Sequence, residues 1–218
     1  RSFTITNISI GSYEKGYYIK TDNSSYSANN KLEFENLWYR SAHSPWENMS
    51  FAENGSLQRG LAATKTSVYV SGRSTASNTA DIYLSEYSAE TGEHIRDIML
   101  GDEGKIGYLP CNDVFKDTEG NILISNMSLN IASTPVQIHL VNLTDGSLTN
   151  VATLSGNGNI SGRIDHVGVY GDVRSGNFTV FAAVASTANV IRWKVSDGVV
   201  ASAESKTFTK FYPATSTT

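Results

Sequence analysis

Three pairs of neighbouring residues could do chemistry, and they recur at a fixed interval. Arg59-Gly60, Asn112-Asp113 and Asp165-His166 follow one another every 53 residues. They supply a guanidinium, an amide, two carboxylates and an imidazole, which can bind polar ligands or move protons. Equal spacing in a repeat places residues at equivalent positions, so we expect these side chains to converge.

This convergence has a functional and a structural interpretation. The functional one is a binding pocket made of Arg59, Asn112, Asp113, Asp165 and His166. In an enzyme, Asp113, Asp165 and His166 would be the candidate acid and base. In the structural interpretation, Asp and Asn at strand corners cap backbone N–H groups, and Arg pairs with Asp to hold neighbouring units together. No G-x-S-x-G elbow is present to supply a serine nucleophile for Asp165-His166.

Other motifs with a chemical signature are incomplete. The four histidines lack zinc-motif spacing, and residues 113–121 (DVFKDTEGN) lack the calcium spacing of an EF-hand. Residues 156–162 (GNGNISG) miss the G-x-G-x-x-G pattern. We interpret Cys111 as a small buried apolar residue rather than a nucleophile. The sequence therefore predicts no cofactor and no metal.

Short strands must position the polar pairs. Residues 108–156 contain four apolar runs separated by Asp-, Gly-, Asn- and Ser-rich breaks, typical of a four-stranded antiparallel sheet such as a propeller blade. Related runs lie before and after it, and the dipeptides Thr91-Gly92, Asp145-Gly146 and Asp197-Gly198 end the third run of each unit. We predict an all-β propeller with four-stranded antiparallel blades of about 54 residues, either four-bladed or part of a larger ring.

The domain assignment follows from these repeats. Residues 37–218 are assigned to the propeller, with blades at about 60–101, 108–156 and 163–212. Residues 1–36 hold β-type runs that resemble at most a partial blade. An Asn- and Ser-rich loop after Arg40 carries Trp46, a candidate contact for a sugar ring.

Composition restricts the setting and the partners. The 218 residues carry a net charge of −4 with 17% charged residues, which disfavours nucleic acid as a partner. No apolar run is long enough to span a bilayer, and the single cysteine cannot form an internal disulfide. Sparse Lys, abundant Ser, Thr, Asn, Gly and Tyr, and a first residue other than Met favour a secreted or cell-surface protein, including an outer-membrane-attached lipoprotein.

Several segments together resemble a known group of proteins. The order L-W-x-x-S, R-G-[LI]-A, V-Y-V-S-x-R, P-x-N-D-V and I-x-x-[SA]-N-[ML]-[ST] is similar to that in secreted Bacteroidetes β-propeller proteins of unknown function, some of which are labelled as cell-adhesion proteins. The segments that carry the resemblance are Leu37, Trp38 and Ser41, residues 59–62, 68–71 with Arg73, 82–93, 110–114, 122–128 and 162–171, the last including Asp165 and His166. The resemblance implies a surface or secreted propeller and supplies no catalytic residues.

These observations lead to one expected function and two alternatives. We expect a non-catalytic extracellular propeller that binds a glycan or another surface protein, in adhesion or surface recognition. The first alternative is an enzyme, a lyase or hydrolase, with its site at the mouth of the propeller channel. The second is a structural subunit of an extracellular assembly, in which a second fragment or subunit completes the ring.

Overall fold

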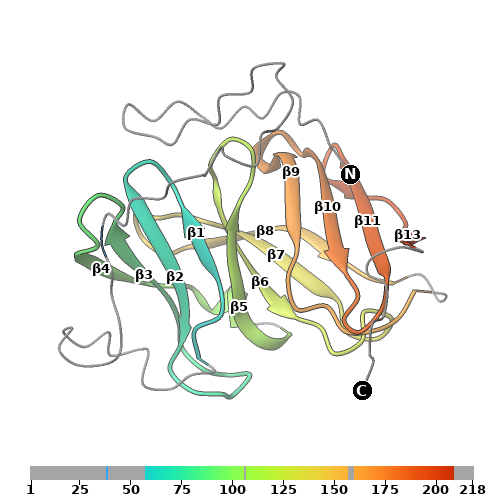
Figure 1. Ribbon diagram of the computed structural model, residues 1–218, viewed down its shortest axis with the longest axis horizontal. Coiled ribbons are helices and arrows are strands. Elements are labelled where there is room, and N and C mark those ends of the chain that lie inside the picture. Colours follow the sequence, from blue (N-terminus) through green and yellow to red (C-terminus); the bar gives the residue numbers. More distant parts are fainter. Residues whose placement is uncertain (1–37, 39–56, 106, 157–159, 209–218) are drawn as a thin grey trace, which may run out of the picture. The chain divides into compact units, whose positions relative to one another are not determined.

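The computed structural model describes Trp38 and residues 57–105, 107–156 and 160–208 (Figure 1). The chain divides into two compact units, Arg1–Tyr39 and Arg40–Thr218, and every described strand belongs to the second. The β-type runs of residues 1–36 and the loop with Trp46 lie outside the described residues. In the part of the chain described, no helix is long and apolar enough to cross a membrane.

Each of the three predicted repeats forms one antiparallel sheet of consecutive strands. Sheet 1 consists of β1 (Leu61–Ala63), β2 (Ser67–Arg73), β3 (Ile82–Ser88) and β4 (His94–Met99). Sheet 2 follows the short 3-10 turn η1 (Asp102–Lys105) and consists of β5 (Tyr108–Lys116), β6 (Ile122–Met127), β7 (Val136–Val141) and β8 (Leu148–Leu154). The prediction of an all-β chain with four-stranded antiparallel sheets is confirmed for these two repeats.

Sheet 3 has five strands where the sequence predicts four. It contains β9 (Gly168–Asp172), the 3-10 turn η2 (Val173–Ser175), β10 (Asn177–Ala183), β11 (Asn189–Ser196), β12 (Val199–Val200) and β13 (Glu204–Thr207). The fifth strand arises because β12 and β13 pair separately with the two ends of β11. The break between them brings Ala203 into the core, where it is buried.

The turns explain why each repeat folds back on itself. The three predicted turn glycines, Gly92, Gly146 and Gly198, have φ of 69°, 75° and 76°, a region that L side chains rarely adopt. At Gly146 a Cβ would also lie 1.9 Å from the carbonyl oxygen of Met99. This turn of sheet 2 is therefore pressed against the end of sheet 1.

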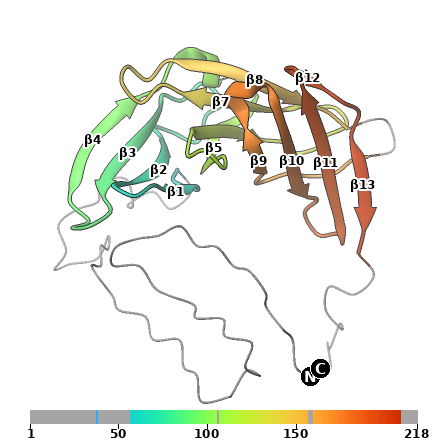
Figure 2. The same ribbon diagram turned by 90° about the horizontal axis from the view of Figure 1, so that it is seen from above.

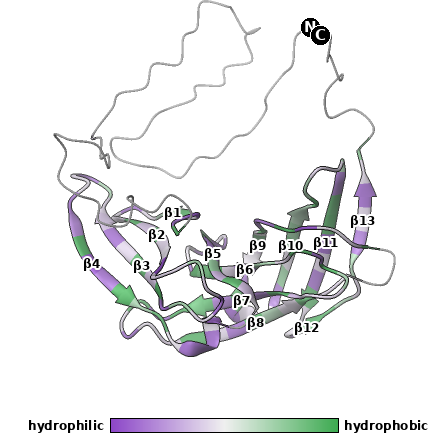
Figure 3. Cartoon of the chain, turned by 90° about the horizontal axis from the view of Figure 1, so that it is seen from below, coloured by the Kyte–Doolittle hydropathy of each residue, from purple (hydrophilic) through white to green (hydrophobic). Residues whose placement is uncertain are grey.

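The three sheets follow one another as a fan, with their first strands on the inside. In Figure 2, β1, β5 and β9 lie near one another, while β4, β8 and β13 lie on the outside. Hydrophobic and hydrophilic positions alternate along β10 and β11 (Figure 3), as expected of strands with one covered face. Side chains from sheets 1 and 2 form one core, and those from sheets 2 and 3 form a second.

Candidate functional site

The beginning of β5 has an unusual backbone that places two of the predicted site residues. The pairing of β5 with β6 jumps from Tyr108–Met127 to Asp113–Ser125, so β5 bulges between these points. Within the bulge, Leu109 and Cys111 have φ of 47° and 51°, although neither is glycine. Such conformations are uncommon for L-residues and are often found at functional sites. The bulge leads directly into Asn112 and Asp113.

Asn112 joins sheet 2 to the start of the third repeat. Its side chain is fully buried, and its Nδ2 donates a hydrogen bond of 2.8 Å to the backbone oxygen of Asp165, the residue 53 positions later. The other amide atom, Oδ1, is buried without a hydrogen-bond partner. Ser125, opposite Asp113 on β6, also has a buried hydroxyl without a partner. Buried polar atoms are normally satisfied, so these two need a structural or functional reason.

Asp113 and His166 form a second link between the repeats. The Nδ1 atom of His166 lies 3.1 Å from Oδ2 of Asp113. Burial raises the pKa of Asp113, although nearby His166 and the backbone N–H groups of Val114 and Val167 oppose that increase. With Nδ1 donating to the carboxylate, the neutral ring of His166 carries its acceptor at Nε2. The His166 side chain is 54% exposed, whereas that of Asp113 is 10% exposed.

Gly60 is the first-repeat counterpart of Asp113 and His166. Atoms of the same site leave no room for a side chain at this position. A Cβ at Gly60 would lie 2.7 Å from Oδ1 of Asp113 and 2.2 Å from the backbone nitrogen of Val114. The Asp113 carboxylate therefore lies between the equivalent positions of both neighbouring repeats. The sequence pair Arg59-Gly60 needs its glycine for this close approach.

Asp165 is held mainly by an arginine that the sequence interpretation missed. Arg163 donates from Nη2 to Oδ1 at 2.6 Å and from Nε to both carboxylate oxygens at 3.0 Å. The carboxylate of Asp165 raises the pKa of Arg163. Arg59 approaches the same oxygen with Nη2 at 3.8 Å. In an extended chain, the side chains of residues two positions apart point to the same side. The spacing of Arg163 and Asp165 could therefore have predicted their contact.

The structure thus brings together all five residues that the 53-residue interval predicted to converge. With Arg163 they form what we call the inner-end cluster, made of Arg59, Asn112, Asp113, Arg163, Asp165 and His166. Among its buried members, Asp113 accepts from the backbone N–H of Val167, as the structural interpretation expected, whereas Asn112 donates to the carbonyl oxygen of Asp165. Its outer members remain accessible: the side chains of Arg59, Asp165 and Arg163 are 32%, 23% and 46% exposed. Trp46 lies outside the described residues.

The chemistry open to the inner-end cluster is binding or proton transfer. Burial raises the pKa of the Cys111 thiol to about 12, which removes this neighbour of the cluster as a nucleophile at neutral pH. In the described ranges, no hydroxyl group hydrogen-bonds to His166. Also among the described residues, no group of three or more His, Cys, Asp or Glu side chains is placed to hold a metal ion.

Comparison with known proteins gives no match to a family model, to a curated protein or to a solved structure. The resemblance to secreted Bacteroidetes propellers therefore stays a prediction from the sequence motifs.

Proposed function

We propose that the three sheets are blades of an extracellular β-propeller and that the inner-end cluster binds a carbohydrate at the mouth of its channel. The observation that carries this proposal is the convergence of four partly exposed polar head groups where the first strand of each repeat begins. In a propeller the first strand of each blade lines the central channel. The inside position of β1, β5 and β9 in the fan supports this assignment (Figure 2).

The exposed groups suit the hydroxyl groups of a sugar. Arg59 and Arg163 provide forked donors, and the carboxylate of Asp165 provides an acceptor between them. Nε2 of His166 adds an acceptor when the ring is neutral. Sugars present donors and acceptors close together, so a surface of mixed character matches them better than one of a single charge.

The buried members would support the exposed ones without touching the ligand. Asn112 and Asp113 are fixed by bonds to the third repeat, and a site whose side chains are held in place in advance loses less conformational entropy on binding. Replacing Asn112 or Asp113 would disturb the packing of the sheets. Tests of binding should therefore change the accessible residues.

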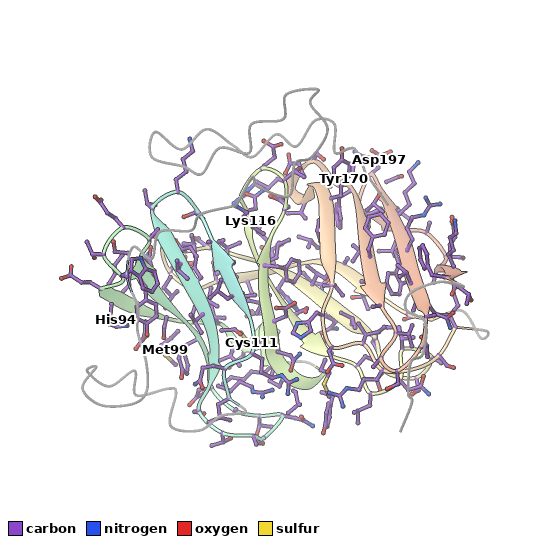
Figure 4. All side chains as sticks on the ribbon, in the orientation of Figure 1. His94, Met99, Cys111, Lys116, Tyr170 and Asp197 are labelled. Atoms are coloured by element: carbon purple, nitrogen blue, oxygen red, sulfur yellow. The ribbon has the colours of Figure 1, made fainter. Side chains whose placement is uncertain are left out.

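The experiment is a glycan-array screen of the full chain, followed by titration calorimetry of a hit with Arg59→Ala and His166→Ala. The control is Lys116→Ala, which removes an exposed cation at the opposite end of β5 from Cys111 (Figure 4). We expect Arg59→Ala to weaken binding at least about tenfold, since a charge-assisted hydrogen bond contributes about 1.5 kcal/mol or more. Lys116→Ala should bind within about twofold of the wild type.

Three results would reject sugar binding at this site. Equal binding by wild type, Arg59→Ala and His166→Ala would show that the inner-end cluster does not contact the sugar. If Trp46→Ala abolishes binding that both of those variants retain, recognition belongs to the loop after Arg40. If no glycan binds, recognition of a surface protein takes the place of sugar binding.

The pair of Asp113 and His166 favours a second candidate function, an acid–base enzyme acting on the same ligand class. A buried carboxylate that bonds Nδ1 of a half-exposed histidine fixes the ring tautomer needed for a general base. A lyase, which needs no protein nucleophile, fits the described residues better than a hydrolase that uses one. Product release from the bound glycan by the wild type, lost in His166→Ala while binding persists, would distinguish this enzyme from a binding protein.

A further inference from the structure

The chain uses one kind of sheet-to-sheet interface twice. We call the side of a sheet that faces the following sheet its forward face and the side that faces the preceding sheet its rear face. In sheet 3, the forward face is the side turned away from sheet 2. On the forward face, Tyr69 of sheet 1 and Leu123 of sheet 2 hold the same position, since each lies between a first-strand and a third-strand partner in register. Both are buried in the core that joins their sheet to the following one.

The forward face of sheet 3 has the same organisation but is open. Phe181 pairs with Gly168 of β9 and Arg192 of β11, which makes it the counterpart of Tyr69 and Leu123. It is 41% exposed, and Tyr170 on the same face is 70% exposed. Two buried counterparts indicate that this face is built to be covered.

The rear face of sheet 1 is also exposed, although the rear faces of sheets 2 and 3 are buried. Leu61, Val114 and Val167 follow one another every 53 residues and begin the rear face of each repeat. Val114 and Val167 are buried against the preceding sheet, whereas Leu61 is 65% exposed. Met99, at the other edge of the rear face, is 57% exposed. Figure 4 shows Met99 on β4 and Tyr170 on β9, in the two outer sheets of the fan.

The two open faces carry side chains of opposite charge, Lys194 on sheet 3 and Asp97 on sheet 1. The forward face of sheet 3 carries Lys194 and Tyr170 on either side of Thr179, around a hollow of about 300 Å³ between β9, β10 and β11. The rear face of sheet 1 carries the carboxylate of Asp97, which accepts a hydrogen bond from Ser85 and lies 3.0 Å from Nε2 of His94. Lys194 on the forward face can thus meet the carboxylate of Asp97 on the rear face, while the exposed apolar side chains of the two faces pack together.

We propose that two copies of this chain close a ring, in which the forward face of sheet 3 of each copy packs on the rear face of sheet 1 of the other. A second copy is favoured because it carries a rear face of the type that forward faces already bind inside the chain. One two-fold axis covers both open faces of both copies at once. The described sheets of two copies would supply six blades, within the usual range of about four to eight. The inference depends on the blade arrangement proposed above and is independent of sugar binding.

The test measures the mass of the full chain by sedimentation velocity between micromolar and hundred-micromolar concentrations. We expect twice the chain mass of 23.6 kDa. Phe181→Lys damages the forward face of sheet 3, and Leu61→Lys damages the rear face of sheet 1. Each should raise the dimer dissociation constant about 100-fold, because a lysine charge would be buried in both interfaces of the ring. The control Leu129→Lys changes a residue, 51% exposed, in the connection between β6 and β7 and should leave the dimer intact.

A mixing experiment separates this ring from other dimers. A mixture of Phe181→Lys and Leu61→Lys contains one undamaged forward face and one undamaged rear face, so it should form mixed dimers more tightly than either variant alone. A wild type that stays monomeric at all concentrations overturns the proposal, as does a dimer unaffected by both changes. Circular dichroism of each variant confirms that it is folded. Sugar binding by Arg59→Ala is a separate measurement, so failure of the ring and failure of the binding site can be distinguished.

Discussion

Gly60→Ala tests whether the inner-end cluster holds the repeats at a fixed distance. An added Cβ would lie 2.2 Å from the nitrogen of Val114, whereas ordinary contact begins at 3.4 Å. The start of β1 must therefore withdraw by about 1 Å, and the atom in its way is backbone rather than a flexible side chain. Overpacking of this kind costs about 1–3 kcal/mol, and we expect the upper end of the range because β5 is already bulged at this point.

The assay is urea unfolding of the full chain followed by circular dichroism. For a urea dependence of about 2 kcal/mol per molar, a loss of about 3 kcal/mol lowers the midpoint by about 1.5 M. The matched control is Gly168→Ala, where nothing lies within 4 Å of the added Cβ. It should leave stability unchanged or raise it by up to about 1 kcal/mol, since alanine is less flexible than glycine in the unfolded chain. A Gly60→Ala midpoint within about 0.2 M of the wild type would refute the close packing of β1 against β5.

Three further predictions concern ionisable groups. Burial raises the pKa of Asp113 above its ordinary 3.8, so the wild type should lose stability as pH rises from 3.8 through the folded-state pKa. The Asp113→Asn variant should not show this loss. Parallel profiles of urea midpoint against pH for the two proteins would contradict the prediction. Burial opposes ionisation of Glu86, but hydrogen bonds from Arg96, Ser67 and Tyr69 outweigh it and lower its pKa. Glu86→Ala should therefore lose about 2 kcal/mol at pH 7 and progressively less as pH falls below 4.5, and a constant difference in urea midpoint would count against it. Native Cys111 should react with a thiol reagent at pH 8 at least about 100-fold more slowly than the urea-unfolded chain, and equal rates would show that it is accessible.

The sequence was informative wherever structure depends on local pattern or on the repeat interval. Alternation of apolar residues and the positive-φ turn glycines are local, which is why the sheets containing Gly92 and Gly146 could be placed in advance. The meeting of Asn112 with Asp165, and of Asp113 with His166, followed from the 53-residue interval alone. A repeat converts a distance along the chain into proximity in space, so no contact prediction was needed.

What could not be predicted depends on packing between distant residues. The left-handed backbone at Leu109 and Cys111 contradicts their local preferences and is stabilised by surroundings such as the hydrogen bond from the Leu109 N–H to Oδ1 of Asn78. The separate pairing of β12 and β13 depends on burial of Ala203 in a core formed mostly by other strands. The two-residue spacing of Arg163 and Asp165 indicated a possible contact. Whether Arg163 binds Asp165 or solvent depends on tertiary structure.

In the inner-end cluster, the buried residues join the sheets and the exposed residues are those proposed to bind a ligand. The cluster therefore connects the proposed sugar site with the proposed ring. Asn112 and Asp113 join sheet 2 to the start of the third repeat, and the proposed ring requires that this junction is rigid. The same bonds fix the backbone of Asp165 and the ring of His166, on which the proposed ligand binding would depend. A ring of two chains would carry two clusters around one axis. Calorimetric stoichiometry of one sugar per ring would then mean that a ligand spans both clusters, and two per ring would mean that each copy binds alone.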